Sequence, residues 1–342
     1  MKRLISIFLL CTVLLSGCAT TQKAPEKKQY TATFLTLFDT VTTIVGKAES
    51  EETFRAETQK IHDELLEYHQ LFDIYNEYEG INNLKTVNDN AGGEPVVVDA
   101  RIIEFLQDCK EYWELTDGMV NVAMGGMLRL WHETREDGRD DPLNARLPDE
   151  AKLAEAAEHM DFDAVVLDAE RSTVCITDPM VRLDVGAVAK GWSAQRVCEN
   201  APEGLLISVG GNVCATGPKD EAGTPWVIGV QDPRDPDNYL HTVKLAEGSL
   251  VTSGDYQRVY VVDGEAYHHI IDPETHYPGT LWSSVTILCE DSGLADALST
   301  ALFLLPKEAG EKILEQCGAE AMWVDREGEV SCTPGFEKQI RT

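Results

Sequence analysis

The segment Asp184-Val-Gly-Ala-Val-Ala-Lys190-Gly191 combines a carboxylate, a lysine and small residues where an apolar run ends. Residues 181–185 have the apolar character of a strand, and residues 192–200 read as a helix. A strand that ends in Gly and Ala before a helix lets backbone N–H groups approach an anion, and Lys190 adds a mobile positive charge. The segment therefore predicts a phosphate or pyrophosphate site, although it matches neither G-x-x-x-x-G-K-[ST] nor G-x-G-x-x-G. The structural alternative is a tight strand-to-helix turn with a surface lysine.

A second pair of candidate residues lies in the apolar run 294–305, which predicts a helix that stops at Pro306. Asp296 and Thr300 are four residues apart, so their oxygens point the same way from one helix face. A carboxylate and a hydroxyl can hold a hard cation such as Mg²⁺, with carbonyls and waters completing its shell. A surface acid is the alternative interpretation, but a carboxylate in an otherwise apolar helix needs a partner.

The elements that must position these residues are mixed in type. Alternating Thr and Val predict a strand over 34–45, and helices are expected after Ser50, Asp99 and Pro148 and over 307–317. Short apolar runs predict further strands at 164–167, 174–177, 181–185, 205–209, 226–230, 258–262, 268–271 and 284–288. Residues 131–147 are charged and contain Gly and Pro, which predicts an exposed loop. Because strands and helices follow no βαβ rhythm, the pattern favours an α+β fold.

The N-terminus predicts export and a lipid anchor. Lys2 and Arg3 precede a short apolar run, too short to span a bilayer comfortably, and Leu15-Ser-Gly-Cys18 resembles a bacterial lipobox. We expect residues 1–17 to be a lipoprotein signal peptide, cleaved before a lipidated Cys18. Residues 18–30 then form a flexible tether on the extracytoplasmic side of a cell membrane, and residues 31–342 form the domain. An ordinary signal peptide with an incidental cysteine is the alternative.

The composition restricts the partners of the domain. Beyond residue 30 the chain keeps 24 of its 29 Lys and Arg and 58 of its 59 Asp and Glu, a net charge of −34. Such a surface repels nucleic acid and anionic lipid, so a polyphosphate substrate would need a divalent cation. Eight histidines without H-x-x-x-H spacing give no zinc-protease signal. The seven cysteines after Cys18 are widely spaced and read as small buried hydrophobes, with disulfide pairing as the alternative.

Five short elements occur together in one order. They are D-x-G-x-x-A-K-G at 184–191, S-x-G-G-N at 208–212, T-S-G-x-Y at 252–256, H-I-I-D-P at 269–273 and A-D-A-L-S-T at 295–300. With these elements the chain resembles the FAD:protein FMN transferases, the ApbE-type flavin transferase family, from about residue 34 to the C-terminus. The lipobox agrees with this resemblance, because many members are exported lipoproteins.

The resemblance implies a single two-lobed, T-fold-like domain of mixed sheets and flanking helices, with FAD between the lobes and Mg²⁺ on its pyrophosphate. A Thr or Ser hydroxyl of a target flavoprotein, in a D-x-x-[ST]-G-A-[ST] motif, would attack the phosphorus on the FMN side. FMN would become phosphoester-linked to the target and AMP would leave. The implied metal ligands are the Ala187 carbonyl, Asp296 and Thr300. The implied FAD contacts are Phe38, Tyr75, Asn121, Val122, Ala123, Asp184, Lys190 and Ile271.

This chain departs from the family pattern in two segments. Phe38 stands in Phe-Asp-Thr where relatives often have Met in Met-Gly-Thr, and position 299 is Ser where some relatives have a second Asp near the metal. The second departure bears on the charge around the metal.

A threonine hydroxyl is a poor nucleophile and needs a nearby base. His269 is the first candidate, because its unperturbed pKa lies near neutrality, and Asp272 is the second. His268 is equally placed by sequence, but neighbours on a strand face opposite ways, so we expect one of the two to face the site. A His269 that only braces the Asp-Pro turn is the alternative.

Two other functions stay open from the sequence. The first is an FAD pyrophosphatase that uses the same metal and gives FMN and AMP with water as the nucleophile. The second is a flavin-binding lipoprotein without chemistry, which would have no need of Asp296, Thr300 and Lys190. The acceptor pattern is absent from this chain, so the protein is not expected to be its own target.

Overall fold

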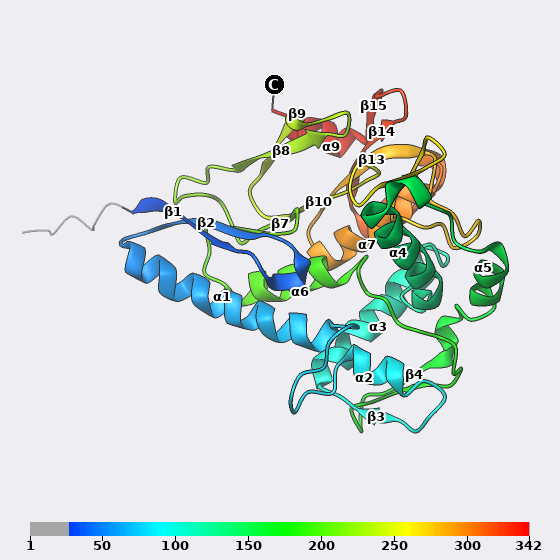
Figure 1. Ribbon diagram of the computed structural model, residues 1–342. Helices are drawn as coiled ribbons and strands as arrows, with labels where there is room; N and C mark the ends of the chain where they lie inside the picture. The colour runs from blue at the N-terminus through cyan, green and yellow to red at the C-terminus, as the bar shows by residue number, and fades with distance from the viewer. Residues whose placement is uncertain (1–26, 342) are drawn as a thin grey trace, which may run out of the picture.

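The computed structural model describes residues 27–341, apart from the side chain of Pro236. Its centre is an antiparallel eight-stranded sheet in the order β1-β2-β6-β7-β10-β13-β14-β15 (Figure 1). Its strands are β1 (Lys28–Phe34), β2 (Thr42–Ala48), β6 (Leu205–Val209), β7 (Asn212–Ala215), β10 (Gly248–Gly254), β13 (Trp282–Cys289), β14 (Glu320–Asp325) and β15 (Val330–Cys332).

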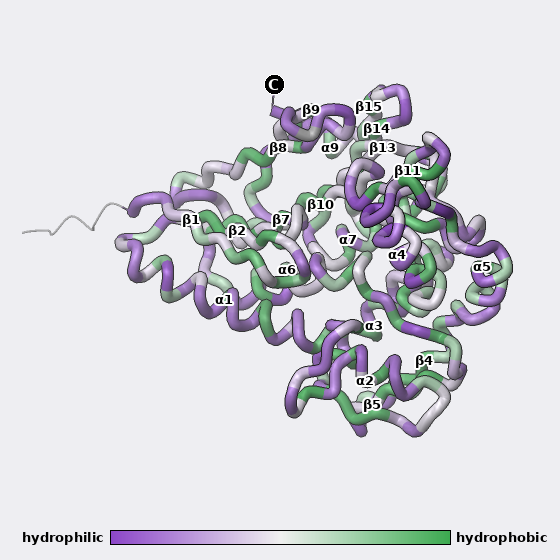
Figure 2. The backbone as a smooth tube through the Cα atoms, viewed as in Figure 1, coloured by the Kyte–Doolittle hydropathy of each residue, from purple (hydrophilic) through white to green (hydrophobic). Residues whose placement is uncertain are grey.

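Helices cover one face of this sheet and form the main core. They are α1 (Glu51–Phe72), α6 (Ala189–Asn200), α7 (Ser292–Leu304) and α8 (Lys307–Cys317). Both α6 and α7 contact the central strands as well as each other. Fully buried Trp192 and Phe303 lie in this core, and hydrophobic segments run along the central strands in Figure 2. The sheet and α7 therefore form a rigid support for the loops at their ends.

A β-ribbon and a short helix lie on the other side of the sheet. The ribbon is β8 (Trp226–Asp232) paired with β9 (Asp235–Leu245), and the helix is α9 (Pro334–Gln339). Trp226, Val243 and Phe336 are buried there in a second apolar cluster. Figure 1 shows this layer opposite α1 and α6.

The remaining elements lie at the far end of α1 in Figure 1. They are α2 (Leu84–Asp89), β3 (Val96–Val97), α3 (Ala100–Leu115), α4 (Gly125–Asp140), α5 (Glu150–Ala157), β4 (Val165–Asp168), β5 (Thr173–Ile176), β11 (Tyr260–Val262) and β12 (Glu265–Tyr267), with 3-10 turns at Leu37–Asp39, Pro142–Asn144 and Phe162–Ala164. A third apolar cluster around Trp131 joins α4 to the β11–β12 hairpin. The α+β class is confirmed, with several sheets and flanking helices and no barrel among the described elements.

Most of the predicted helices are confirmed. Ser50 Oγ accepts a hydrogen bond of 3.1 Å from Thr53 N, and Asp99 Oδ1 accepts one of 2.9 Å from Arg101 N, so both residues cap their helices. The α8 helix follows Pro306 and ends at Gly318, whose φ of 67° suits a glycine. The helix expected after Pro148 is present as α5, which is capped by Asp149 and ends at Ala157.

Several element predictions are wrong. Residues 34–45 are not one strand but two, because the chain reverses at Leu37–Asp39. Residues 131–147 are not an exposed loop, since α4 continues to Asp140 and Trp131 is buried. Residues 181–185 form no strand and make only one isolated bridge, from Arg182 to Met124, while residues 268–271 follow β12 instead of forming a strand.

The N-terminal predictions fall almost entirely outside the described residues, including the signal peptide and Cys18. The tether was predicted to reach residue 30, but β1 already begins at Lys28 and pairs with β2. No helix within residues 27–341 is long and apolar enough to cross a membrane. The seven cysteines of this part of the chain are all free thiols.

Candidate active site

A cavity of about 500 Å³ opens where the ends of β7, β10 and α6 meet the middle of α7 and the first half of α4. This volume lies within the range of roughly 300–1,000 Å³ that is typical of small-molecule sites. Most of the predicted site residues line the cavity: Phe38, Tyr75, Asn121, Val122, Asp184, Ala187, Lys190, His269, Ile271, Asp296 and Thr300. The structure therefore brings together residues that are more than 250 positions apart in the sequence.

The buried Asp296 is the charged centre of the site. Its Oδ2 accepts a hydrogen bond of 2.8 Å from Gly191 N and lies 3.6 Å from Lys190 Nζ. Burial raises the pKa of this carboxyl, and the nearby ammonium of Lys190 and the Gly191 amide act in the opposite direction. A carboxylate kept at the bottom of a cavity beside a lysine is suited to binding a cation or a ligand with mixed charge.

Thr300 and Ala187 supply two further oxygens to the cavity. Thr300 lies one helical turn after Asp296 on α7, as the four-residue spacing predicts. Gly191 is the third residue of α6, so its N–H is one of the first-turn donors that have no acceptor within the helix, and Asp296 supplies that acceptor. The Ala187 carbonyl lies just before the helix cap Val188 and accepts no hydrogen bond within the described part of the chain.

These oxygens fit a magnesium ion that is shared with a substrate. Residues 27–341 contain no cluster of three or more His, Cys, Asp or Glu that could hold a metal by itself. Mg²⁺ is commonly bound by one or two carboxylates together with substrate phosphates and water, instead of by an all-protein cage. One carboxylate, one hydroxyl and one free carbonyl agree with that kind of site, and Ser299 is oriented elsewhere, toward Ser253 Oγ at 2.8 Å.

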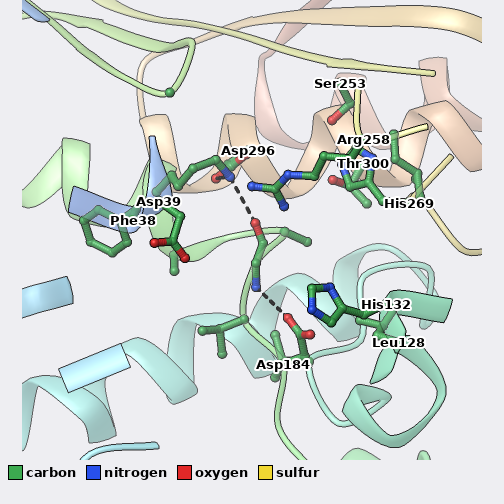
Figure 3. A pocket seen from close by; sticks show the side chains of 18 of the residues that line it. Phe38, Asp39, Leu128, His132, Asp184, Ser253, Arg258, His269, Asp296 and Thr300 are labelled. Carbon is green, nitrogen blue, oxygen red and sulfur yellow. Dashed lines mark hydrogen bonds and ion pairs between the residues drawn. The ribbon is translucent and has the colours of Figure 1, made fainter. Parts of the chain in front are cut away.

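Gly186 connects the two charged residues of the first predicted motif. Its N–H donates to Asp184 Oδ1 over 3.0 Å, and its carbonyl accepts from Lys190 Nζ over 3.0 Å (Figure 3). Asp184 N also donates to the Val122 carbonyl over 2.8 Å, which ties this loop to the segment before α4. Burial raises the pKa of the Asp184 carboxyl. The predicted strand is thus a hydrogen-bonded loop, and Lys190 lies in the first turn of α6.

Aromatic rings line another part of the cavity. Phe38 N donates to His69 Nδ1 over 3.2 Å, and the two rings meet edge to face with centroids 5.5 Å apart. The ring of Tyr75 is largely exposed and lies 6.0 Å from that of His132, at an angle of 35°. Such faces can hold a planar ring system by stacking.

His269 lines the cavity and His268 does not. The Nδ1 atom of His269 is buried without a hydrogen-bond partner in the described residues. Burial, reinforced by the positive charge of Arg258, lowers the pKa of His269 to about 3. His268 instead bonds the Gly279 carbonyl at 2.8 Å and packs against Phe303, and burial lowers its pKa too. The imidazole of His269 is therefore neutral and able to accept a proton, although its basicity is low.

Two predicted site residues are not on the cavity wall. Asp272 Oδ1 accepts hydrogen bonds from Glu274 N at 2.7 Å and Thr275 N at 3.2 Å, so it shapes the turn after Ile271 and is not placed to act as a base. Ala123 is fully buried in the core, where its N–H donates to Asn121 Oδ1 over 2.9 Å. Only Asn121 and Val122 of that stretch reach the cavity.

Sequence reasoning missed the cationic side chains of the cavity, Arg135 and Arg258. Arg135 is buried on α4, and its Nη2 lies 2.7 Å from His132 Nδ1. The assignment of residues 131–147 to an exposed loop concealed Arg135 and His132. Arg258 lies two residues after the T-S-G-x-Y element, and this position was the signal that could have identified it. Together with Lys190 these residues provide positive charge for an anion inside a strongly acidic protein.

The fold and the cavity define an α+β protein whose site combines a buried carboxylate, a lysine and ring-binding side chains. The chain belongs to the ApbE family, whose family model matches residues 38–323. Two FAD:protein FMN transferases are similar to it. The protein of Treponema pallidum is 33% identical, and the aligned region covers 75% of this chain and 75% of that protein. The protein of Klebsiella pneumoniae is 31% identical, and the aligned region covers 75% of this chain and 80% of that protein.

Solved structures agree with this assignment. The ApbE protein of Thermotoga maritima superposes with a TM-score of 0.80 at 31% identity, over 92% of this chain and all of the other. The flavin transferase ApbE of Vibrio cholerae has a TM-score of 0.74 over 92% of this chain, and at 21% identity it supports the fold alone.

Proposed function

We propose that the protein is a Mg²⁺-dependent FAD:protein FMN transferase. It moves FMN from FAD to a Thr or Ser hydroxyl of a target flavoprotein, forms a phosphoester bond and releases AMP. The names of the relatives from Treponema pallidum and Klebsiella pneumoniae support the activity. The observation that carries the chemistry is that Asp296, Lys190 and Ala187, whose carbonyl is free, line one cavity together with aromatic rings.

The proposed binding mode follows from these walls. The isoalloxazine ring lies among Phe38, Tyr75 and His132, and the pyrophosphate lies toward Lys190 and Arg258. Asp296, Thr300 and the Ala187 carbonyl would hold Mg²⁺. When bound, this ion neutralises developing negative charge on the phosphate oxygens.

The residues of the chain would then align the transfer and move a proton. A new P–O bond forms between the acceptor hydroxyl and the phosphorus on the FMN side, while the bond from that phosphorus to the bridging oxygen breaks and AMP leaves. Lys190 stabilises the charge of the leaving phosphate. His269 Nδ1, which is buried and unpartnered, receives the proton of the hydroxyl. A bound pyrophosphate offsets Lys190 and Arg258, so it raises the pKa of His269 at the moment of reaction.

The direct test is incubation with FAD and Mg²⁺ and an acceptor protein that carries D-x-x-[ST]-G-A-[ST], followed by intact mass of the acceptor. We expect a mass gain equal to an FMN phosphoester, and no gain when the motif hydroxyls are replaced by Ala or when EDTA is added. Free FMN that accumulates at the same rate with and without acceptor would instead identify an FAD pyrophosphatase. FAD binding with neither product would identify a carrier.

We further propose that the protein works as a lipoprotein on the extracytoplasmic side of a membrane. The support is the Leu15-Ser-Gly-Cys18 sequence after a short apolar run. Mass spectrometry of protein extracted from membranes is expected to find a diacylglycerol group on Cys18. The Cys18→Ser variant is expected to be absent from the membrane fraction. An unmodified N-terminus on membrane-extracted wild type would refute the anchor.

A further inference from the structure

Phe38 and Asp39 both have left-handed backbone conformations, with φ of 52° and 51°. For residues with a side chain this conformation costs roughly 1–2 kcal/mol each, and it persists only where the surroundings impose it. Asp tolerates it better than most residues because its short polar side chain can bond locally. Asp39 makes no such bond, so local stabilisation does not explain why this residue occupies this position.

The carboxylate of Asp39 is exposed on the cavity wall. Within residues 27–341 it takes part in no hydrogen bond and no ion pair, although Lys190 and Arg258 line the same cavity. Figure 3 shows the side chain turned into the cavity. Its negative charge also acts on Tyr75, which places it within electrostatic range of the aromatic wall. A free acceptor in a ligand site implies that its hydrogen-bond donors come from the ligand.

The position of Asp39 indicates which part of the ligand its carboxylate contacts. It follows Phe38 of the aromatic wall directly, and it lines the same cavity as the Lys190–Asp296 pair that would face the pyrophosphate. In a dinucleotide, the group between a ring and a phosphate is a sugar or sugar alcohol that carries hydroxyl groups. A carboxylate accepts hydrogen bonds from hydroxyls, whereas it repels phosphate.

We propose that Asp39 is a specificity-determining residue that accepts hydrogen bonds from the hydroxyl groups linking ring and phosphate in the bound dinucleotide. The inference rests on the proposed function for the identity of the ligand. The hydroxyls belong either to the ribityl chain of the flavin half or to the ribose of the adenosine half, and both share the chemistry that Asp39 recognises.

The test measures binding to purified full-length protein by flavin fluorescence and calorimetry, with FAD, FMN, AMP and lumiflavin as probes. Asp39→Asn and Asp39→Gly are expected to weaken FAD binding about tenfold to a hundredfold, the range for a hydrogen bond to a charged group. Weaker binding of FMN with unchanged AMP binding identifies the ribityl chain, and the reverse identifies the ribose. Lumiflavin has the ring without hydroxyls or phosphate, so its binding is expected to stay unchanged.

A stability readout separates this role from a structural one. Glycine adopts φ near 50° without strain, so Asp39→Gly is expected to leave the melting temperature of the ligand-free protein equal or higher while FAD binding falls. Asp117 is the matched control, because it is also an exposed Asp, with φ of 50°, and it does not line the cavity. Asp117→Gly is expected to change stability in the same sense and to leave FAD binding unchanged.

Three results would overturn the assignment: unchanged FAD affinity in both Asp39 variants, an equal loss of lumiflavin binding, or a melting temperature of Asp39→Gly that falls together with affinity. Protein flavinylation is measured in parallel. Wild type that binds FAD without transferring FMN would refute the proposed function and leave this inference standing. Wild type that transfers FMN, together with Asp39 variants that bind FAD as tightly as wild type, would refute this inference and leave the proposed function standing. Wild type that does not bind FAD would refute both.

Discussion

The backbone N–H of Gly191 donates a hydrogen bond of 2.8 Å to Asp296 Oδ2, and this bond joins the start of α6 to the middle of α7. The bond fixes the orientation of the buried carboxylate. It also satisfies a first-turn N–H of α6 that has no acceptor within the helix. The close approach of the two helices at this point also leaves no room for a side chain at position 191.

Gly191→Ala is therefore expected to destabilise the protein. A Cβ at this position would collide with Asp296 Cβ and with the Ser292 carbonyl oxygen, both of which are fixed in the core. We expect a loss of about 2–3 kcal/mol in the free energy of unfolding, measured by urea denaturation. Gly126→Ala on α4 is the control, because its Cβ would have its nearest neighbour at 3.8 Å and the change favours helix by up to about 1 kcal/mol. Equal stability of the two variants would contradict the close contact of α6 and α7.

Asp296→Asn is expected to separate activity from stability. The amide keeps an oxygen for the Gly191 N–H but removes the only carboxylate assigned to the metal, so we expect kcat to fall by about 10² or more. Because burial disfavours the charged carboxylate, the neutral variant is expected to unfold at the same or a higher temperature. FAD binding should survive in weakened form. Wild-type turnover at saturating Mg²⁺ would refute the metal assignment.

The sequence allowed some of this site to be predicted, because short spacings fix geometry. Asp296 and Thr300 had to share a face once their segment was a helix, and both line the cavity. Phe38 also lies there, but its left-handed backbone depends on contacts with a distant part of the chain, such as its bond to His69. A local pattern carries no information about such contacts.

The failure at α4 has a different physical cause. Its buried face contains Met127, Trp131, Arg135 and Gly138, so a charged residue and a glycine take core positions and break the apolar period. Arg135 tolerates burial because His132 lies within hydrogen-bond distance and the cavity is close. Polar residues that serve a site therefore concealed the helix that positions them.

Arg258→Gln is expected to weaken FAD binding about tenfold, because it removes a positive charge that faces the proposed pyrophosphate. The melting temperature should not change, because the side chain is exposed. The dependence of FAD affinity on salt should become shallower. Arg171→Gln is the matched control, since this arginine is exposed and, within residues 27–341, its side chain makes only a long ion pair of 3.7 Å with Asp168. A shared loss of affinity in both variants would show a general effect of charge instead of a contact at the site.

His269 is expected to make the protein less stable in mild acid. With a pKa of about 3 in the folded protein and about 6.5 when unfolded, only the unfolded chain takes up this proton between these values. Stability from this group is therefore complete above pH 6.5 and decreases as the pH falls toward 3, with a slope of up to about 1.4 kcal/mol per pH unit. His269→Gln removes this contribution. Urea denaturation at pH 7 and pH 4.5 should then show a larger loss for wild type than for the variant, by up to about 2.5 kcal/mol. Carboxylates titrate in both proteins and cancel in the difference, so equal losses would mean that the imidazole of His269 titrates normally.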